Sequence, residues 1–229
     1  MEFLSPAWFS ALAAIILIDL VLAGDNAIVI ALAARSLPPH LQRKAIVWGT
    51  VGAIIVRAAM TMAVVWLLRI PGLMLVGGLA LVWIAYKLLA PAQDGDAHAT
   101  PADSFWSAMK TIVVADALMG IDNVLGVAGA AHGSFGLVVI GLLVSVPIVV
   151  WGSTIVLKWV ERFPLITYGG AGVLAFTAAR MIVSEPMLDE IYDPHFAARL
   201  ATYAVLVAGV LAAGWWAAHR GNQVSSHAA

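Results

Sequence analysis

The chain has 229 residues, of which 62% are hydrophobic and 11% are charged, and its formal net charge is -1. A soluble globular domain carries about 25% charged residues, so this composition excludes an ordinary soluble protein and indicates a membrane protein. A nearly neutral chain offers no basic field that would favour nucleic acid. The absence of cysteine excludes a disulfide scaffold and a thiolate metal site.

Seven apolar segments are predicted to cross the bilayer as helices, because a spanning helix needs roughly 20 apolar residues. In chain order they cover approximately residues 7–34, 45–68, 72–90, 105–131, 135–158, 165–183 and 198–218. The polar segment 91–104, which is rich in Pro, Ala and Asp, is expected to be a loop. We therefore predict an all-α fold, a single transmembrane domain over residues 1–229, with the lipid bilayer as its surroundings.

The basic residues predict the orientation, because cytoplasmic loops carry an excess of Lys and Arg. One side of the predicted spans has Arg69, Arg180 and Arg199. The other side has eight basic residues: Arg35, Arg43, Lys44, Lys87, Lys110, Lys158, Arg162 and Arg220. We expect a multi-pass protein of the bacterial plasma (inner) membrane, with its N-terminus outside and its C-terminus in the cytoplasm.

The first and fourth segments carry the same D-x5-D-N pattern. It reads Asp19-LVLAG-Asp25-Asn26 in the first and Asp116-ALMGI-Asp122-Asn123 in the fourth, an offset of 97 residues. Two weaker matches follow in the same order: Trp48-Gly49-Thr50 with Trp151-Gly152-Ser153, and Gly77-Gly78 with Gly169-Gly170. The Gly pairs are interpreted as points of close helix packing. Three spans per unit predict a 3+3 inverted repeat, residues 7–90 and 105–183, with the segment 198–218 added.

Four Asp residues lie near the middle of apolar segments, where each charge costs at least about 2.5–3.5 kcal/mol. Protonation, pairing, water or a bound cation must offset this cost. Gly24 and Gly120 are expected to let the helices unwind locally, so that both patterns meet at the midplane. The predicted ligands of a cation are Asp19, Asp25, Asn26, Asp116, Asp122 and Asn123. These hard oxygen donors suit Mn²⁺, Mg²⁺ or Ca²⁺.

Two alternatives bear on this site. Asp and Asn in membrane helices can simply hydrogen-bond helices together, although a duplicated pattern favours a functional site. Arg57, inside the second segment, has two interpretations that the sequence leaves open. Its side chain either extends to the membrane interface or faces the acidic residues as a counter-ion in the absence of metal.

The segments LAGDNAIVIALAARSLP and ADALMGIDNVLGVAGAAHG resemble the TerC family of integral membrane proteins, and the resemblance covers nearly the whole chain. Within that family the chain is similar to the short YjbE type, which lacks appended soluble domains. The resemblance implies membership of the LysE-like transporters, an association with tellurium resistance by name, and export of manganese. It also implies that some members supply Mn²⁺ to secreted metalloenzymes, so that such enzymes or the secretion machinery are expected partners.

The expected function is therefore export of a divalent cation, with Mn²⁺ favoured by the resemblance and proton antiport as the expected coupling. In that mechanism Asp25, Asn26, Asp122 and Asn123 contact the ion, while Asp19 and Asp116 complete the site or carry protons. No permanently bound cofactor and no enzymatic activity are expected. An intramembrane aspartyl protease is disfavoured because the residues before the Asp pairs do not fit its motifs. A membrane scaffold that helps partner proteins to acquire metal, either alone or as a homo-oligomer, is the alternative.

Overall fold

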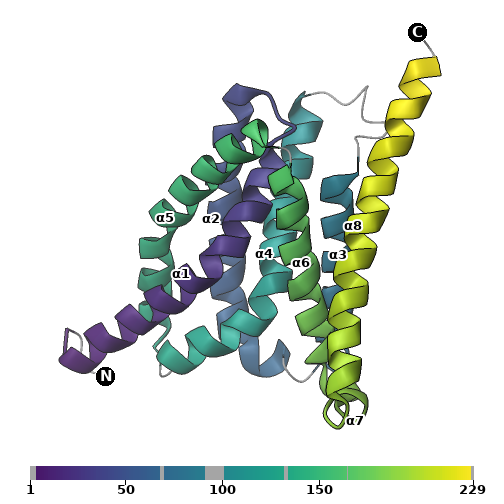
Figure 1. The fold of residues 1–229 in the computed structure, drawn as a ribbon. Helices are drawn as coiled ribbons and strands as arrows, with labels where there is room; N and C mark the ends of the chain where they lie inside the picture. Colours follow the sequence, from purple (N-terminus) through teal and green to yellow (C-terminus); the bar gives the residue numbers. More distant parts are fainter. Residues whose placement is uncertain (1–3, 68–69, 91–100, 132–133, 164, 228–229) are drawn as a thin grey trace.

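The computed structural model describes residues 4–67, 70–90, 101–131, 134–163 and 165–227, and it contains no β-strand in these ranges. Its long helices are α1 (Pro6–Ala34), α2 (Pro39–Leu67), α3 (Leu73–Leu89), α4 (Pro101–Ala131), α5 (Phe135–Arg162), α6 (Leu165–Val183) and α8 (Phe196–His227) (Figure 1). A single 3-10 turn, η2 (Pro186–Leu188), and the short helix α7 (Asp189–Tyr192) lie between α6 and α8. Helices suit a bilayer because every backbone polar group must be satisfied within the chain. The predicted all-α class is confirmed for this part of the chain.

The number of membrane spans depends on α1 and α3. Within the described ranges, five helices are long and apolar enough to cross a membrane, and a sixth is added if the bent helix α1 counts as one span. α1 bends by 47° between its parts Pro6–Leu20 and Gly24–Ala34. α3 is apolar but has only 17 residues. At 1.5 Å per residue it reaches about 25 Å, which is short of a hydrocarbon core of about 30 Å.

Several helix ends differ from the predicted segment ends. The physical reason is that an apolar segment indicates only the part of a helix that lies in the bilayer, whereas the helix itself can extend beyond it. α2 begins at Pro39, ahead of the predicted 45, and α4 begins at Pro101, inside the segment predicted to be a loop. Proline fits the first turn of a helix because it needs no amide partner there. Residues 91–100 of the predicted loop lie outside the described ranges. α8 continues past the apolar segment to His227.

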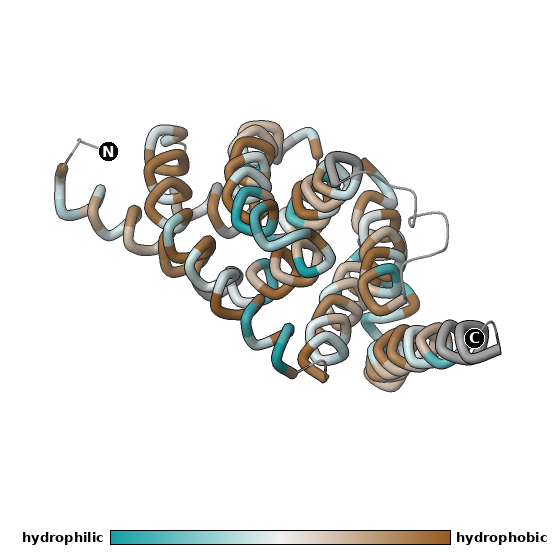
Figure 2. The backbone as a smooth tube through the Cα atoms, turned by 90° about the horizontal axis from the view of Figure 1, so that it is seen from above, coloured by the Kyte–Doolittle hydropathy of each residue, from teal (hydrophilic) through white to brown (hydrophobic). Residues whose placement is uncertain are grey.

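The outer faces of the helices are apolar, as a lipid environment requires. Soluble proteins rarely expose large contiguous apolar patches. Large apolar side chains that are more than half exposed occur on most of the long helices, among them Leu17, Trp48, Ile55, Trp66, Val76, Trp83, Leu143, Trp151 and Val205. Figure 2 shows the bundle from above, with hydrophobic residues spread along its helices. The chain is therefore an integral membrane protein.

Each of the helices α1, α2 and α3 packs mainly against helices of the second half of the chain, α4, α5 and α6. α1 packs against α5 and α4, α2 packs against α4 and α5, and α3 packs against α6. α8 packs on α6 and α3 at one edge of the bundle, far from the N-terminus (Figures 1 and 2). Only 6% of its most apolar segment is buried, so α8 is an addition to a six-helix body and not part of its core.

Glycines permit the close approach of α3 to α6 and of α6 to α1. A Cβ atom on Gly78 would lie 2.8 Å from the backbone oxygen of Ala178 and 2.6 Å from Cγ1 of Ile182. A Cβ atom on Gly170 would lie 2.4 Å from Cγ2 of Ile28 in α1. A Cβ atom on Gly169, in contrast, would meet nothing within 4 Å from another helix of the described chain. The interpretation of the Gly pairs as packing points is confirmed at Gly77, Gly78 and Gly170 and is wrong at Gly169.

We expect Gly78→Ala to lower the free energy of unfolding by about 1–3 kcal/mol, because the added methyl group overpacks a contact with an immobile backbone oxygen. Gly169→Ala is the matched control, and it should be neutral or stabilising by up to about 1 kcal/mol because alanine favours a helix more than glycine does. Thermal unfolding in detergent would compare the two variants. Equal destabilisation by both substitutions would contradict close α3–α6 packing.

Both ends of α3 are held by charged side chains from distant parts of the sequence. Glu185, between α6 and η2, is only 2% exposed. Its carboxylate accepts hydrogen bonds from the amides of Gly72 at 2.9 Å, Met74 at 3.0 Å and Leu75 at 3.2 Å. At the other end, Arg35 donates to the carbonyl oxygen of Leu88 at 2.8 Å. Since helix ends leave amides and carbonyls without internal partners, these contacts satisfy polar groups at both ends of α3.

Glu185→Ala should lower the free energy of unfolding by about 1–3 kcal/mol, because it leaves amides at the start of α3 without an acceptor. Glu190→Ala is the control, since Glu190 lies in the same acidic segment and is exposed. Hydrogen exchange at the amides of residues 72–75 would localise the effect. Unchanged protection there in the Glu185 variant would show that the carboxylate does not hold this helix end.

Candidate functional site

A buried arginine joins two acidic side chains from different halves of the chain. Arg57 lies in α2, Asp19 in α1 and Asp116 in α4, all near the middle of their helices. Nη1 of Arg57 pairs with Oδ1 of Asp19, and Nη2 pairs with Oδ1 of Asp116. The three residues are 5%, 2% and 6% exposed. Because α1, α2 and α4 pack on one another, this charged cluster lies inside the bundle.

Four buried side-chain atoms on α1, α2 and α4 have no hydrogen-bond partner in the part of the chain that the structure describes. They are Oδ2 of Asp116, Nε of Arg57, Oδ1 of Asn26 and Oγ1 of Thr50. Buried polar groups are nearly always satisfied, so each exception needs an explanation. Three of these four atoms are oxygens, which are the donors that a hard divalent cation prefers.

The Asp25-Asn26 pair lies on α1 just after its bend. Asn26 is 3% exposed, whereas Asp25 is half-buried and accepts a hydrogen bond from the backbone amide of Asn26 at 3.0 Å. The expected unwinding at Gly24 is not seen, because α1 stays helical through this residue and changes direction instead. A bend turns the two halves of a helix toward different neighbours while most backbone hydrogen bonds are kept.

The second pattern lies on α4. Asn123 is 8% exposed, and α4 is helical through Gly120, so local unwinding is absent at this position as well. The side chain of Asp122 lies outside the part that the structure describes. Asn26 and Asn123 are therefore both buried on the helices that also carry Asp19 and Asp116.

The meeting of all four carboxylates stays a prediction, because the side chain of Asp122 lies outside the part that the structure describes. The structure brings Asp19 and Asp116 to one guanidinium. Among the described side chains, however, no group of three or more His, Cys, Asp or Glu residues is close enough to hold a metal ion.

Two residues of the bundle interior were not identified from the sequence as candidates. Thr50 was noted only as part of a repeated Trp-Gly-Thr/Ser motif, yet its buried hydroxyl has no partner in the described part. Arg180, near the end of α6, was assigned from the sequence to one side of the membrane, but its side chain is partly buried. Lys87 occupies the matching position in the first unit and is exposed. Only helix packing distinguishes these two basic residues, so no sequence signal was available.

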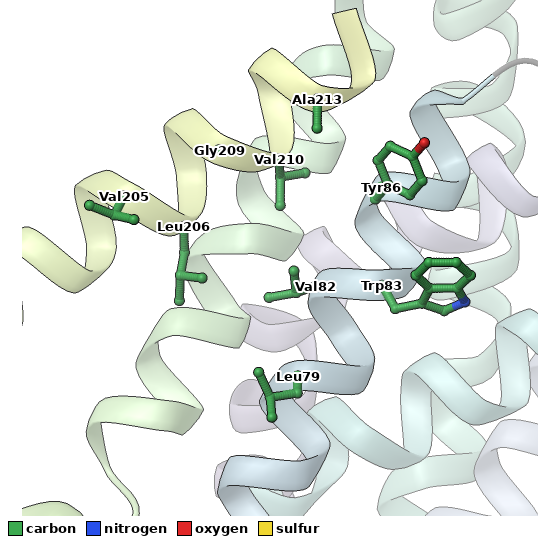
Figure 3. A pocket seen from close by; sticks show the side chains of 9 residues that line it. All are labelled: Leu79, Val82, Trp83, Tyr86, Val205, Leu206, Gly209, Val210 and Ala213. Carbon is green, nitrogen blue, oxygen red and sulfur yellow. The ribbon is translucent and has the colours of Figure 1, made fainter. Parts of the chain in front are cut away.

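An apolar groove lies apart from the charged cluster, between α3 and α8. It has a volume of about 530 Å³ and is lined by Leu79, Val82, Trp83, Tyr86, Val205, Leu206, Gly209, Val210 and Ala213. Figure 3 shows the lining residues on α3 and α8, with Val82 and Leu206 between the two helices. None of these lining side chains is acidic or basic, so the groove does not offer a path for a cation.

Taken together, a helical bundle with an apolar exterior and a buried charged cluster defines a polytopic integral membrane protein with a polar centre. The chain belongs to the integral membrane protein TerC family, whose model matches residues 4–222. The resemblance seen in the two D-N segments is thereby confirmed.

Relatives in this family are also membrane proteins. The chain is 47% identical over 178 residues to the uncharacterized membrane protein YjbE of Bacillus subtilis (strain 168), covering 78% of this chain and 81% of that protein. It is 26% identical over 175 residues to the UPF0053 inner membrane protein YgdQ of Escherichia coli (strain K12), covering 69% and 73%. It is 22% identical over 221 residues to the uncharacterized membrane protein YkoY of Bacillus subtilis, covering 86% and 68%. No solved structure matches the chain.

Proposed function

We propose that this protein exports a divalent metal cation, with Mn²⁺ as the favoured substrate, across the bacterial plasma membrane. The observation that carries the proposal is the buried cluster of Asp19, Arg57 and Asp116, in which an acidic oxygen has no partner among the described residues. Ionisable residues inside a membrane are costly and typically mark ion pathways. A purely structural cluster would be expected to satisfy its polar atoms.

Asp25, Asn26, Asp122 and Asn123 are proposed to contact the ion, and Asp19 and Asp116 to complete its coordination. The burial of Asn26 and Asn123 supports this assignment, since both amides lie on the helices that carry the buried Asp pair. Carboxylate and amide oxygens suit Mn²⁺, Mg²⁺ and Ca²⁺. The choice of manganese rests on the family resemblance, so the three ions should be compared directly.

The proposed architecture is a seven-span protein in which α1–α3 and α4–α6 form an inverted repeat. Helix packing supports this repeat. If α1, α2 and α3 are exchanged with α4, α5 and α6, the contact of α1 with α5 becomes the contact of α4 with α2, and both are present. The contacts of α3 with α6 and of α1 with α4 remain the same under this exchange, and both are also present. Asp19 and Asp116, which occupy equivalent positions of the repeated pattern, bind the same side chain. Inverted repeats place transported ions at the midplane between the units. The basic residues favour an external N-terminus.

The test is cation flux from proteoliposomes that contain the purified protein, with Mn²⁺ inside and an indicator dye outside. Asp25→Asn combined with Asp122→Asn should reduce flux at least about 100-fold, as expected when charged ligands of an ion are lost. The matched control neutralises two exposed acids, Asp189→Asn with Glu190→Gln, and should transport normally. Loss of flux in the control as well would show that neutralisation affects folding rather than the site.

The same assay separates the alternatives. An acidic exterior should accelerate efflux if protons are exchanged for the metal, and a gradient of either sign should have no effect if they are not. Absence of flux in folded wild-type protein under both gradients would reject the transporter and support the scaffold that helps partners to acquire metal.

A further inference from the structure

One basic side chain serves two equivalent acids. Arg57 lies nine residues after Trp48, and the position nine residues after Trp151 in the second unit is Val160. The repeated pattern therefore supplies two aspartates, Asp19 and Asp116, but a single arginine in α2 that pairs with both of them.

The contacts of Arg57 with Asp19 and Asp116 leave polar atoms unsatisfied, so they are not the most stable arrangement of these groups. Oδ2 of Asp116 and Nε of Arg57 are buried and lack hydrogen-bond partners in the described part of the chain. A buried ion pair compensates for desolvation only when its remaining polar atoms are also satisfied. Each carboxylate is held by one nitrogen of Arg57, so neither has the two parallel bonds that arginine can form with a carboxylate. A single hydrogen bond to each carboxylate is easier for a metal ion to replace than two parallel bonds would be.

The charges of Asp19, Asp116 and Arg57 also indicate that a metal ion can replace the guanidinium. Two carboxylates and one guanidinium leave a net negative charge, whereas two carboxylates and a divalent cation are neutral. Without either cation, the two acids would have to bind protons or remain as buried carboxylates, which is strongly unfavourable in a membrane interior. Arg57 and a divalent cation therefore compete for the same negative charge.

We infer that Arg57 is a tethered counter-cation, which releases Asp19 and Asp116 when the divalent cation binds and returns to them when the carrier reorients empty. This inference rests on the proposed function: its binding step uses the proposed metal site, and its transport step uses the proposed export. Occupancy of the acids by Arg57 weakens apparent metal affinity, since binding-competent molecules are then a minority. In return, the empty protein crosses between its two states without bare buried charges.

The binding step is tested by equilibrium titration of Mn²⁺ on detergent-solubilised wild type and Arg57→Met. If Arg57 holds the acids in about nine of ten metal-free molecules, its removal should tighten the dissociation constant about tenfold. Saturating Mn²⁺ should also raise the melting temperature of Arg57→Met more than that of wild type, because the ion replaces a missing charge. The control is Arg43→Met, an exposed basic residue of the same helix, which should behave as wild type.

The transport step is tested by comparing net efflux into metal-free medium with exchange of labelled for unlabelled Mn²⁺. Exchange does not require the carrier to reorient empty, whereas net efflux does. Arg57→Met should therefore raise the ratio of exchange to net efflux at least about tenfold over wild type. Where Arg57→Met does not yield folded protein, Arg57→Lys is used: a single ammonium pairs less well with two carboxylates, so the ratio should rise by a smaller factor.

Each outcome decides between the inference and its rivals. Weaker or unchanged Mn²⁺ binding in the Arg57 variants would overturn the inference, as would exchange and net efflux falling in parallel. A wild type that shows neither flux mode, with an Arg57→Met variant that binds Mn²⁺ more tightly, would reject the proposed transporter and keep Arg57 as a competitor of the metal. Tighter binding together with a raised ratio would support both.

Discussion

Arg57→Met should lower the free energy of unfolding by about 3–5 kcal/mol, the cost of leaving one partner of a buried ion pair without compensation. The effect is expected to be large because Asp19 and Asp116 both lose their cation while they are 2% and 6% exposed. Chemical or thermal unfolding in metal-free detergent would measure it. Arg43→Met, on the exposed side of the same helix, should change the free energy of unfolding by no more than about 0.5 kcal/mol.

A triple variant separates charge from packing. Asp19→Leu, Asp116→Leu and Arg57→Met together remove the cluster and fill its volume with apolar side chains, and such replacements are often neutral or stabilising. We expect this variant to recover most of the stability lost in Arg57→Met, with Mn²⁺ binding abolished. If it is as unstable as the single variant, the loss reflects the size and shape of Arg57 and not uncompensated charge.

Asn26→Leu should separate stability from metal binding. Oδ1 of Asn26 is buried without a partner in the described part of the chain, so an apolar residue of similar size leaves the unfolding free energy unchanged or raises it by about 1 kcal/mol. Affinity for Mn²⁺ should nevertheless fall at least about 10–100-fold if that oxygen contacts the ion. Isothermal titration and thermal unfolding of the same sample provide both values.

The contrast for this prediction is Thr61→Val. Thr61 is also a buried polar residue, but its hydroxyl donates to the backbone oxygen of Arg57 at 2.8 Å. Its removal should cost about 1 kcal/mol of stability and leave Mn²⁺ affinity within about threefold of wild type. Equal losses of Mn²⁺ affinity in the two variants would show that Asn26 has no particular role at the site.

The sequence was sufficient to identify the class of the molecule and its polar centre. A high apolar content in segments of spanning length dictates membrane helices, because no other local structure satisfies the backbone in lipid. Asp19 and Asp116 were identifiable because a charge in the middle of an apolar helix is costly and requires a reason. Their repetition at a constant offset made chance an unsatisfactory explanation.

Helix packing determined the direction of Arg57 and the partners of Glu185, which the spacing of residues in the sequence did not determine. The sequence left Arg57 with two interpretations, since a long side chain at that depth is able to reach either the interface or the interior, and only the contact of α2 with α4 and α1 sets its direction. No local pattern indicated that Glu185 caps α3, because its amide partners are more than 100 residues away and meet it only when α3 lies against α6. Local pattern determined which residues lie in the membrane, whereas contacts between distant helices determined which charges meet.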